Sequence, residues 1–250
     1  MVIRLGRRAR TAIFVAVAGI LIIAFCCSLI IMRGSGYAKE TSGKPLNSVT
    51  VIVDAGHGGF DGGASAKDGT VEKDINLSIA LKLRDMLDNL GYSVIMTRET
   101  DEDTADESEK TIRRQKVSDI KNRMKIIEAN PDALFVSIHQ NHYGGESYYG
   151  TQVFYSKNDP RSELLAKDIQ QTVKALLQPQ NERAVKKTGT EIYLLYHAKT
   201  PAVMVECGFL SNVEEAQKLK DDSYQSAMAF SIACGITKYL QQEEIQAEVT

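Results

Sequence analysis

Three residues that could bind a metal ion or move a proton follow short apolar segments of this sequence. His57, His139 and Glu206 each stand at or just past the end of a run rich in β-branched residues. Such runs are typical of strands buried on both faces, and the carboxyl ends of parallel strands meet at one edge of a sheet, where ligands bind. Two imidazoles and a carboxylate, with one position left open, are the usual composition of a catalytic zinc site. The sequence therefore predicts a metal site at this edge.

The stretch from residue 51 to residue 72 brings a second carboxylate to the same place. Residues 54–63 include five glycines, and a turn rich in glycine lets the backbone and His57 approach a ligand closely. The turn ends at Glu72, the expected first residue of an amphipathic helix. Glu72 is either a ligand or a favourable partner of the helix dipole, worth about 0.3 to 1 kcal/mol, and the residues alone leave both roles open. Glu206 is then the spare carboxylate, which a zinc hydrolase needs to move the proton.

Apolar runs and helical periodicities alternate along the chain from residue 49. We predict strands over 49–54, 92–97, 133–138, 151–155, 191–195 and 202–205, helices over 72–90, 117–127, 161–177, up to 219 and over 222–240, and loops over 98–114 and 179–189. Strands that alternate with helices form a mostly parallel sheet covered on both faces. The predicted fold class is α/β, with a mostly parallel, six-stranded twisted sheet and helices on both faces, preceded by one N-terminal transmembrane helix.

The first part of the chain has the composition of a membrane anchor. Residues 1–10 contain four arginines and no acid, and residues 11–32 form a 22-residue run without a charge. About 20 apolar residues span a bilayer, and a basic flank stays in the cytoplasm. We predict the following segments: a cytoplasmic basic tail over 1–10, a transmembrane or signal-anchor segment over 11–32, a linker over 33–48, a catalytic domain over 49–242 outside the cytoplasm, and a C-terminal tail over 243–250.

Cleavage of the N-terminal segment is the main alternative to an anchor. Gly36-Tyr37-Ala38 is a triplet of the kind that signal peptidase cuts, although the apolar run is longer than a usual signal core. With cleavage the domain would be secreted. Lipid modification at Cys26 is disfavoured, because Phe25 stands where a small residue is expected.

The net charge of the chain after the predicted N-terminal segment argues against nucleic acid as a partner. Residues 41–250 carry 24 basic and 31 acidic side chains, a formal net charge of −7. An acidic domain outside the cytoplasm is not expected to bind nucleic acid. Two of the four cysteines fall in the apolar run, and Cys207 and Cys234 alone suggest no disulfide framework.

Three separated motifs resemble those of a known enzyme family. GHGGxDxG with the distant Glu72, SIHxN around His139 and PAxxVExGFLSN around Glu206 are similar, in order and approximate spacing, to the zinc N-acetylmuramoyl-L-alanine amidases of the Amidase_3 family. The resemblance covers about residues 49–240. It implies one zinc ion per domain held by His57, Glu72 and His139, with Glu206 as the catalytic acid and base. The implied reaction is hydrolysis of the amide between the lactyl group of N-acetylmuramic acid and L-alanine in peptidoglycan.

Finer features of the sequence suggest a subgroup of this family. The basic tail, the single apolar span and the VECGFLSN motif look most like the short, sporulation- and germination-specific CwlD type, which implies spore cortex peptidoglycan and the muramic δ-lactam pathway. Some family members inhibit themselves with an inserted helix, and no spare amphipathic insertion is visible between His139 and Glu206. Control is therefore expected from an unidentified activating or sporulation partner, from substrate modification or from timing of expression. The polar Asn141 is a candidate substrate-binding residue.

Four alternative interpretations compete with this assignment. Cys207 with His139 or His197 would make a thiol hydrolase, but neighbouring residues in a strand point to opposite faces, so Cys207 should point away from Glu206. His142, three residues beyond His139, is the next candidate ligand. A membrane-anchored peptidoglycan-binding module without activity would lack one of the four site residues. A zinc carboxypeptidase of the cell wall differs in its products, because an amidase frees the whole stem peptide with L-alanine at its amino terminus.

Overall fold

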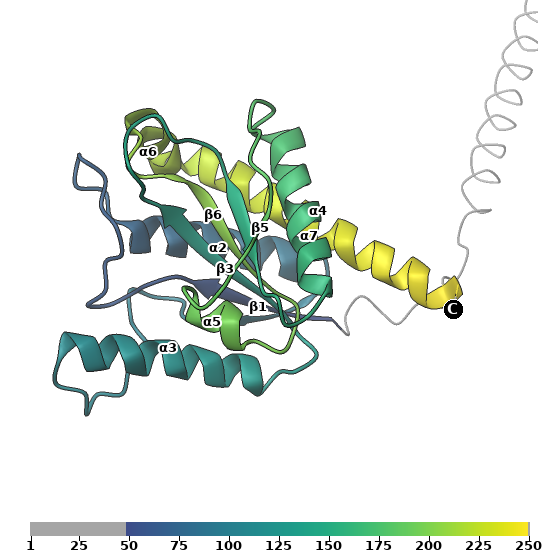
Figure 1. Ribbon diagram of the computed structural model, residues 1–250, viewed down its shortest axis with the longest axis horizontal. Helices are drawn as coiled ribbons and strands as arrows, with labels where there is room; N and C mark the ends of the chain where they lie inside the picture. Colours follow the sequence, from purple (N-terminus) through teal and green to yellow (C-terminus); the bar gives the residue numbers. More distant parts are fainter. Residues whose placement is uncertain (1–48, 250) are drawn as a thin grey trace, which may run out of the picture. The chain divides into compact units, whose positions relative to one another are not determined.

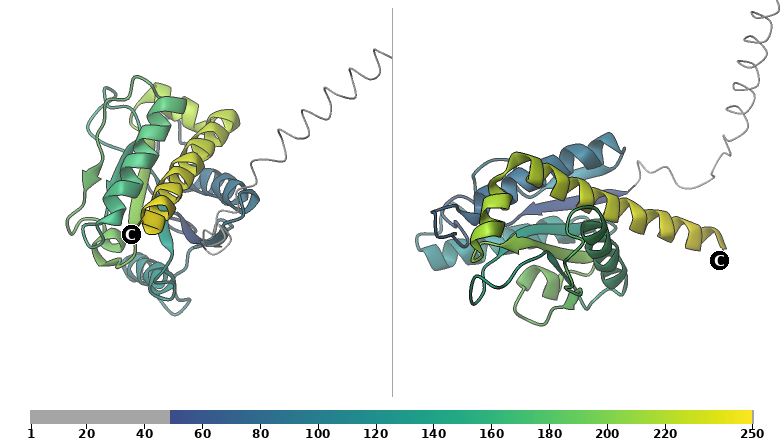
Figure 2. Two further views of the ribbon diagram at one scale, coloured as in Figure 1. Left: turned by 90° about the vertical axis from the view of Figure 1, so that its right-hand side faces the viewer. Right: turned by 90° about the horizontal axis from the view of Figure 1, so that it is seen from above.

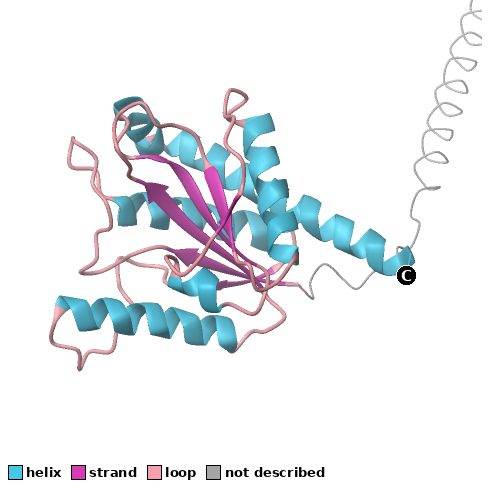
Figure 3. Cartoon of the chain, viewed as in Figure 1, coloured by secondary structure: helices cyan, strands magenta, loops and turns pink. Residues whose placement is uncertain are grey.

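The structure, a computed structural model, describes residues 49–249. The predicted basic tail, apolar segment and linker lie outside the described residues, and the predicted domain boundaries stay predictions. Within residues 49–249, no helix is both long enough and apolar enough to cross a membrane. The described chain forms a six-stranded sheet flanked by helices (Figure 1, Figure 3).

The elements follow the predicted order closely. The strands are β1 (Thr50–Ala55), β2 (Ser93–Met96), β3 (Leu134–Asn141), β4 (Gln152–Tyr155), β5 (Lys186–Lys187) and β6 (Ala202–Phe209). The helices are α2 (Glu72–Asn89), α3 (Ile112–Glu128), α4 (Arg161–Leu176), α5 (Tyr193–His197), α6 (Val213–Lys220) and α7 (Asp222–Val249). The end of α2 and the start of α6 have the expected signals: Gly91 adopts a φ of 87° after α2, and the Asn212 side chain caps α6 by accepting from Glu215 N.

The sheet is mixed, which corrects the prediction of a mostly parallel sheet. Its strand order is β2-β1-β3-β6-β4-β5, and β2, β1, β3 and β6 run parallel to one another. β4 runs antiparallel to β6, and the two-residue β5 pairs parallel with β4. The physical reason is the connection between β3 and β4, which has no helix and is too short for the usual parallel crossover of a dozen or more residues.

Two hydrophobic layers cover the two faces of the sheet, as predicted. α2, α4 and α7 pack on one face, where they bury alternate residues of β1, β3 and β6 such as Val53, Val136 and Val205. α3 and α5 pack on the other face against the intervening residues, such as Phe135 and Met204. The views in Figures 1 and 2 show the same separation of helices. Because side chains alternate along a strand, each residue near the site is assigned to one face.

Three local predictions are wrong. Residues 191–195 were expected as a strand, but Tyr193–His197 form α5, and the sixth strand is instead the short edge strand β5 within the expected loop 179–189. Short apolar runs do not distinguish strand from helix, and here the packing of Leu194 and Leu195 against the α3 layer decides. The helical spacing of Leu176 from Ile169 and Val173 predicts a buried side chain, yet this side chain is exposed at the end of α4.

Candidate metal centre

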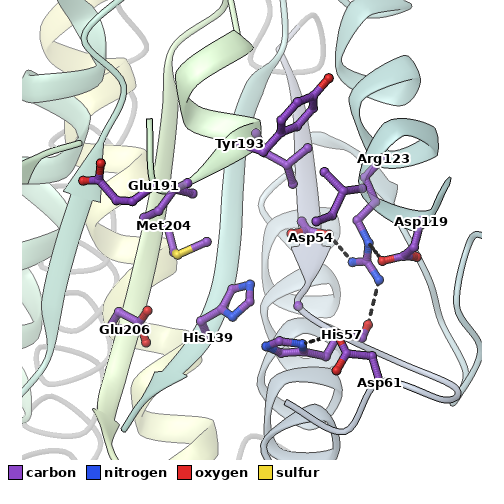
Figure 4. Close-up of a pocket in the computed structure, with 14 residues that line it drawn as sticks. Asp54, His57, Asp61, Asp119, Arg123, His139, Glu191, Tyr193, Met204 and Glu206 are labelled. Atoms are coloured by element: carbon purple, nitrogen blue, oxygen red, sulfur yellow. Dashed lines mark hydrogen bonds and ion pairs between the residues drawn. The ribbon is translucent and has the colours of Figure 1, made fainter. Parts of the chain in front are cut away.

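The three strands with apolar runs deliver their polar residues to the same edge of the sheet. His57 follows β1, and His139 and Glu206 face each other as register partners in β3 and β6. Glu72 is the first residue of α2. Figure 4 shows the side chains of His57, His139 and Glu206 around one cavity, with Met204 beside them. The sequence therefore predicted correctly that these residues come together.

The two imidazoles converge on one carboxylate oxygen. His57 Nε2 lies 3.3 Å and His139 Nδ1 lies 3.0 Å from Glu72 Oε1. One ligand atom from each of the three residues lies within 4.8 Å of the others. The two rings meet edge to face, with their centroids 4.9 Å apart. This arrangement brings two nitrogen donors and one oxygen donor to a common point.

Glu72 is held in place as an anion. Its side chain is buried, its Oε2 accepts a hydrogen bond from Ala64 N at 2.8 Å, and its Oε1 accepts from Gln140 N at 3.1 Å. Burial alone would raise the pKa of Glu72, but His139 and His57 hold it well below its usual range. The carboxylate is thus ionised and fixed in orientation before any ligand binds.

Asp61 and an unusual backbone conformation orient His57. His57 has a φ of 63°, which is uncommon for a residue with a side chain. Its Nδ1 lies 2.9 Å from Asp61 Oδ2, which leaves Nε2 directed at Glu72. Burial alone would lower the pKa of His57, but Glu72 and Asp61 raise it to about 9. A carboxylate on the far nitrogen is the usual partner that fixes a histidine ligand.

Two glycines make room for the site. A Cβ atom added at Gly56 would collide with the imidazole of His139, and one added at Gly63 would crowd Glu72 and His57. Gly63 also has a φ of 70°, a conformation that glycine adopts without strain. The glycine-rich turn thus allows the close approach that its composition predicts.

A buried arginine supports the turn that carries His57. Arg123 of α3 donates to Asp54 Oδ1 at 2.5 Å and to Asp119 Oδ2 at 2.9 Å. It also donates to the carbonyl oxygen of Ala55 at 2.9 Å. A further hydrogen bond goes to the carbonyl oxygen of His57 at 2.7 Å (Figure 4). Burial alone would raise the pKa of Asp54, but Arg123 and the Ser137 hydroxyl lower it to about 2. Arg123 therefore fixes the backbone on both sides of Gly56.

Arg98 supports the same turn from the other side. Its Nε donates to Ala55 O at 2.9 Å, and its Nη2 donates to Gly56 O at 3.2 Å and to Lys73 O at 2.8 Å. No sequence motif predicts a role for Arg98, Arg123 or Asp54. Only Asp54 carried a signal, since it is a charged residue directly after an apolar run.

The carboxylate of Glu206 is less engaged by neighbouring groups than the carboxylate of Glu72. The side chain of Glu206 is half-buried, and within residues 49–249 its Oε2 has no hydrogen-bond partner. Burial raises the pKa of Glu206 to about 7, an effect that Glu72 strengthens and the two histidines oppose. A group with a pKa near neutrality is suited to accept a proton and to return it.

A cavity of about 310 Å³ opens beside these residues. His57, His139 and Glu206 form part of its polar lining, and apolar side chains form the rest of its wall. The apolar wall comes from α3, from α5 with the residue before it, and from β6: Ile120, Ile192, Leu194 and Met204. The cavity thus offers an apolar surface next to charged groups, as substrate sites commonly do.

The remaining candidates lie away from this cluster. Cys207 is fully buried in the layer formed by α2, α4 and α7, on the opposite face from Met204, and burial raises the pKa of its thiol. His142 and His197 are exposed, and neither belongs to the metal-binding group found in residues 49–249. Asn141 ends β3 beside Phe209, and its role in substrate binding stays a prediction. The expectation that Cys207 points away from Glu206 is confirmed.

The donor set fits a zinc ion. Two imidazole nitrogens and one carboxylate oxygen already converge, and a catalytic zinc site has three such protein ligands with a fourth position open. Glu206, whose Oε2 has no partner among the described residues, lines the same cavity, where an acid and base for bound substrate would be needed. Asp101, another acidic residue near the turn, is engaged by Lys73 at the surface.

Comparisons with known proteins agree with the geometry. Residues 51–238 match the family model Amidase_3, described as N-acetylmuramoyl-L-alanine amidase. The chain is 38% identical over 199 residues to the germination-specific N-acetylmuramoyl-L-alanine amidase of Bacillus subtilis, covering 80% of this chain and 83% of that protein.

Solved structures show the same fold. The CwlD amidase from Clostridioides difficile, determined in complex with the GerS lipoprotein, matches with a TM-score of 0.74 and 46% identity over 77% of this chain and 98% of that one. The amidase AmiC2 of Nostoc punctiforme matches with a TM-score of 0.65 and 30% identity over 77% and 97% of the two chains. With its three motifs brought together in one cavity, the chain belongs to the Amidase_3 family of N-acetylmuramoyl-L-alanine amidases.

Proposed function

We propose that this protein is a zinc-dependent amidase that cleaves the bond between the lactyl group of N-acetylmuramic acid and L-alanine in spore cortex peptidoglycan. The observation that carries the proposal is the convergence of His57, Glu72 and His139 beside Glu206, whose Oε2 has no hydrogen-bond partner within residues 49–249. A binding module without activity is disfavoured, because all four residues lie together. A zinc carboxypeptidase is distinguished by its products, since an amidase releases stem peptides with a free L-alanine amino terminus.

Each site residue has a separate task in this reaction. His57, Glu72 and His139 would hold the zinc ion, which supplies Lewis acidity that polarises the amide carbonyl and activates water. Glu206 takes the proton of the attacking water and returns it to the nitrogen of the leaving L-alanine. Asp61 and Arg123 keep His57 in its orientation, and the apolar wall of the cavity limits the access of other water.

The zinc assignment predicts a difference between two histidine variants. His57→Ala should lose most of the bound zinc, because it removes one of the three proposed ligands. The other two, Glu72 and His139, are held in place by hydrogen bonds and cannot move to replace it. His197→Ala, at an exposed position on α5, should keep one zinc per chain. Elemental analysis of the two purified proteins decides, and equal zinc content in both would reject His57 as a ligand.

Two similarities support the proposed cortex substrate and protein partner. One relative is named germination-specific, and a structure neighbour was determined with a lipoprotein bound. We propose by analogy that this protein acts on the cortex and that a protein partner controls it. The charge pattern before residue 33 supports a membrane anchor with the domain outside the cytoplasm.

Protease added from outside tests this location. The domain should be digested in intact protoplasts, or in forespores whose outer layers have been opened, because the proposed anchor places it beyond the membrane. A cytoplasmic protein serves as the control and should survive until the membrane is lysed. Digestion of the domain only after lysis would contradict the location.

A further inference from the structure

Exposed aromatic side chains gather around the edge of the sheet where the metal centre lies. Six aromatic side chains among residues 49–249 are largely exposed: Phe60, Tyr143, Tyr148, Tyr149, Tyr193 and Phe230. Five of them belong to the turn that carries His57, to the connection between β3 and β4, or to α5, and only Phe230 lies elsewhere, on α7. Aromatic residues exposed together commonly mark a surface that binds a partner or a ligand.

Three of these residues lie in the connection between β3 and β4, residues 142–151, which we call the tyrosine loop. Because β6 lies between β3 and β4 in the sheet, the loop has to cross the carboxyl end of β6, the strand that carries Glu206. Register places His139 of β3 and Gln152 of β4 on either side of Glu206. The tyrosine loop therefore passes directly beyond the proposed catalytic residues, next to α6 (Figure 1).

Contacts within and around the tyrosine loop fix its shape. The ring of Tyr148 stacks on Phe209 with centroids 6.1 Å apart and meets the ring of Tyr143 edge-on at 5.2 Å. Asn212 Nδ2 donates to the carbonyl oxygens of Glu146 at 2.7 Å and Tyr148 at 3.2 Å. The Glu146 carboxylate also pairs with Lys67 from the turn that carries His57. A surface that is ordered before binding loses less conformational entropy when its ligand arrives.

We propose that Tyr143 and Tyr149 bind the glycan chain of the substrate by stacking against its sugar rings. The inference rests on the proposed function, because the acyl side of the scissile amide is attached to that chain. A tyrosine ring combines an apolar face with a polar hydroxyl. This matches a sugar ring, which has a face of C–H groups and a rim of hydroxyls. The side chains are 62% and 48% exposed, so their faces are accessible.

The cavity beside the metal centre suits the other half of the substrate. Of the described residues that line the cavity, none belongs to the tyrosine loop. A stem peptide ends after a few residues, and its first residues can enter the cavity of about 310 Å³, whose wall is partly apolar and partly charged. A glycan chain continues in both directions from the scissile bond and needs an open surface. The two halves of the substrate are therefore assigned to opposite sides of Glu206.

Peptide-free glycan strands test the surface without any chemical step. Full-length protein should bind fluorescently labelled strands, and Tyr143→Ala combined with Tyr149→Ala should weaken binding, by roughly threefold to tenfold for each ring. The Phe variants at both positions keep the ring faces and should retain most of the affinity. Phe230→Ala removes the exposed aromatic ring on α7 and should bind like the wild type. Zinc content equal to that of the wild type shows that a variant has folded.

Turnover distinguishes this inference from the proposed function. On intact peptidoglycan the double Ala variant should show a raised KM with kcat largely retained, and on a muramoyl peptide with a single sugar the loss in kcat/KM should be smaller. Double-variant binding to stripped strands as tight as wild-type binding would overturn the inference and assign the surface to a protein partner. A wild-type protein that binds strands but cleaves neither substrate would contradict the proposed function and leave the glycan surface supported.

Discussion

Glu206→Gln is expected to lose between about 10² and 10⁴ in kcat while it keeps its zinc. Glutamine has nearly the same shape as glutamate, but it cannot take the proton from the attacking water. The carboxylate of Glu206 is not among the three groups of residues 49–249 that converge as possible ligands, so the zinc content should not change. The measurement is release of stem peptides from purified peptidoglycan, carried out together with elemental analysis of the same sample.

Cys207→Ala is the matched control, at the neighbouring position in β6. Its thiol is fully buried on the opposite face of the sheet, so its removal should leave turnover close to that of the wild type. The two variants together separate the mechanisms. Near-normal turnover in Glu206→Gln and an inactive Cys207→Ala would show a thiol hydrolase and reject the zinc scheme.

Arg123→Met is expected to lower the free energy of unfolding by about 3 to 5 kcal/mol, because it leaves buried groups without their charged partner. The Asp54 and Asp119 carboxylates and the His57 carbonyl all lose a donor. The positive φ of His57 then has less support, so zinc content should fall as well. Urea unfolding followed by circular dichroism, with elemental analysis of the folded protein, measures both effects.

The difference in the free energy of unfolding between the wild type and Arg123→Met should become smaller at acidic pH. Because the pKa of Asp54 is lowered in the folded protein, to about 2 from an ordinary value of 3.8, its ion pair stabilises the wild type above about pH 4. That contribution is lost as the pH falls from about 4 to about 2. The gap between wild type and Arg123→Met should therefore shrink over this range.

Arg84→Met makes the same change at the protein surface. Arg84 pairs with Asp85 and Glu99, both of which are exposed, so the free energy of unfolding should change by no more than about 1 kcal/mol. A loss in Arg123→Met no larger than the loss in Arg84→Met would contradict the support assigned to Arg123.

Much of the site could be predicted from the sequence, because one fold rule governs it. Apolar strands of a parallel sheet end at a common edge, so the positions of His57, His139 and Glu206 after such strands were enough to group them. Assigning Glu72 as a ligand needed the resemblance to a family, since a helix dipole would explain its position equally well. The structure adds the physical reason, which is that both imidazoles lie against Glu72 Oε1.

The supporting residues could not be predicted, because their partners are distant in the chain. Arg123 lies 69 residues from Asp54 and sits in a helix with four other basic residues before it, so nothing in its local sequence distinguishes it from a solvated side chain. The antiparallel direction of β4 was easier to predict from the sequence. A connection of ten residues without a helix, between Asn141 and Gln152, already favours an antiparallel strand.

The antiparallel direction of β4 also determines how freely the tyrosine loop can change in length. Both of its ends are strands held in register beside Glu206, so an insertion between them need not alter the sheet or the positions of His139 and Glu206. The entropic penalty for closing a flexible loop rises by only about 0.6 kcal/mol when its length doubles. A change in the length of the loop over the end of β6 therefore has a small entropic effect on stability. Enzymes with this sheet can differ in the length of this loop, and so in how many sugar units of a glycan chain the loop contacts.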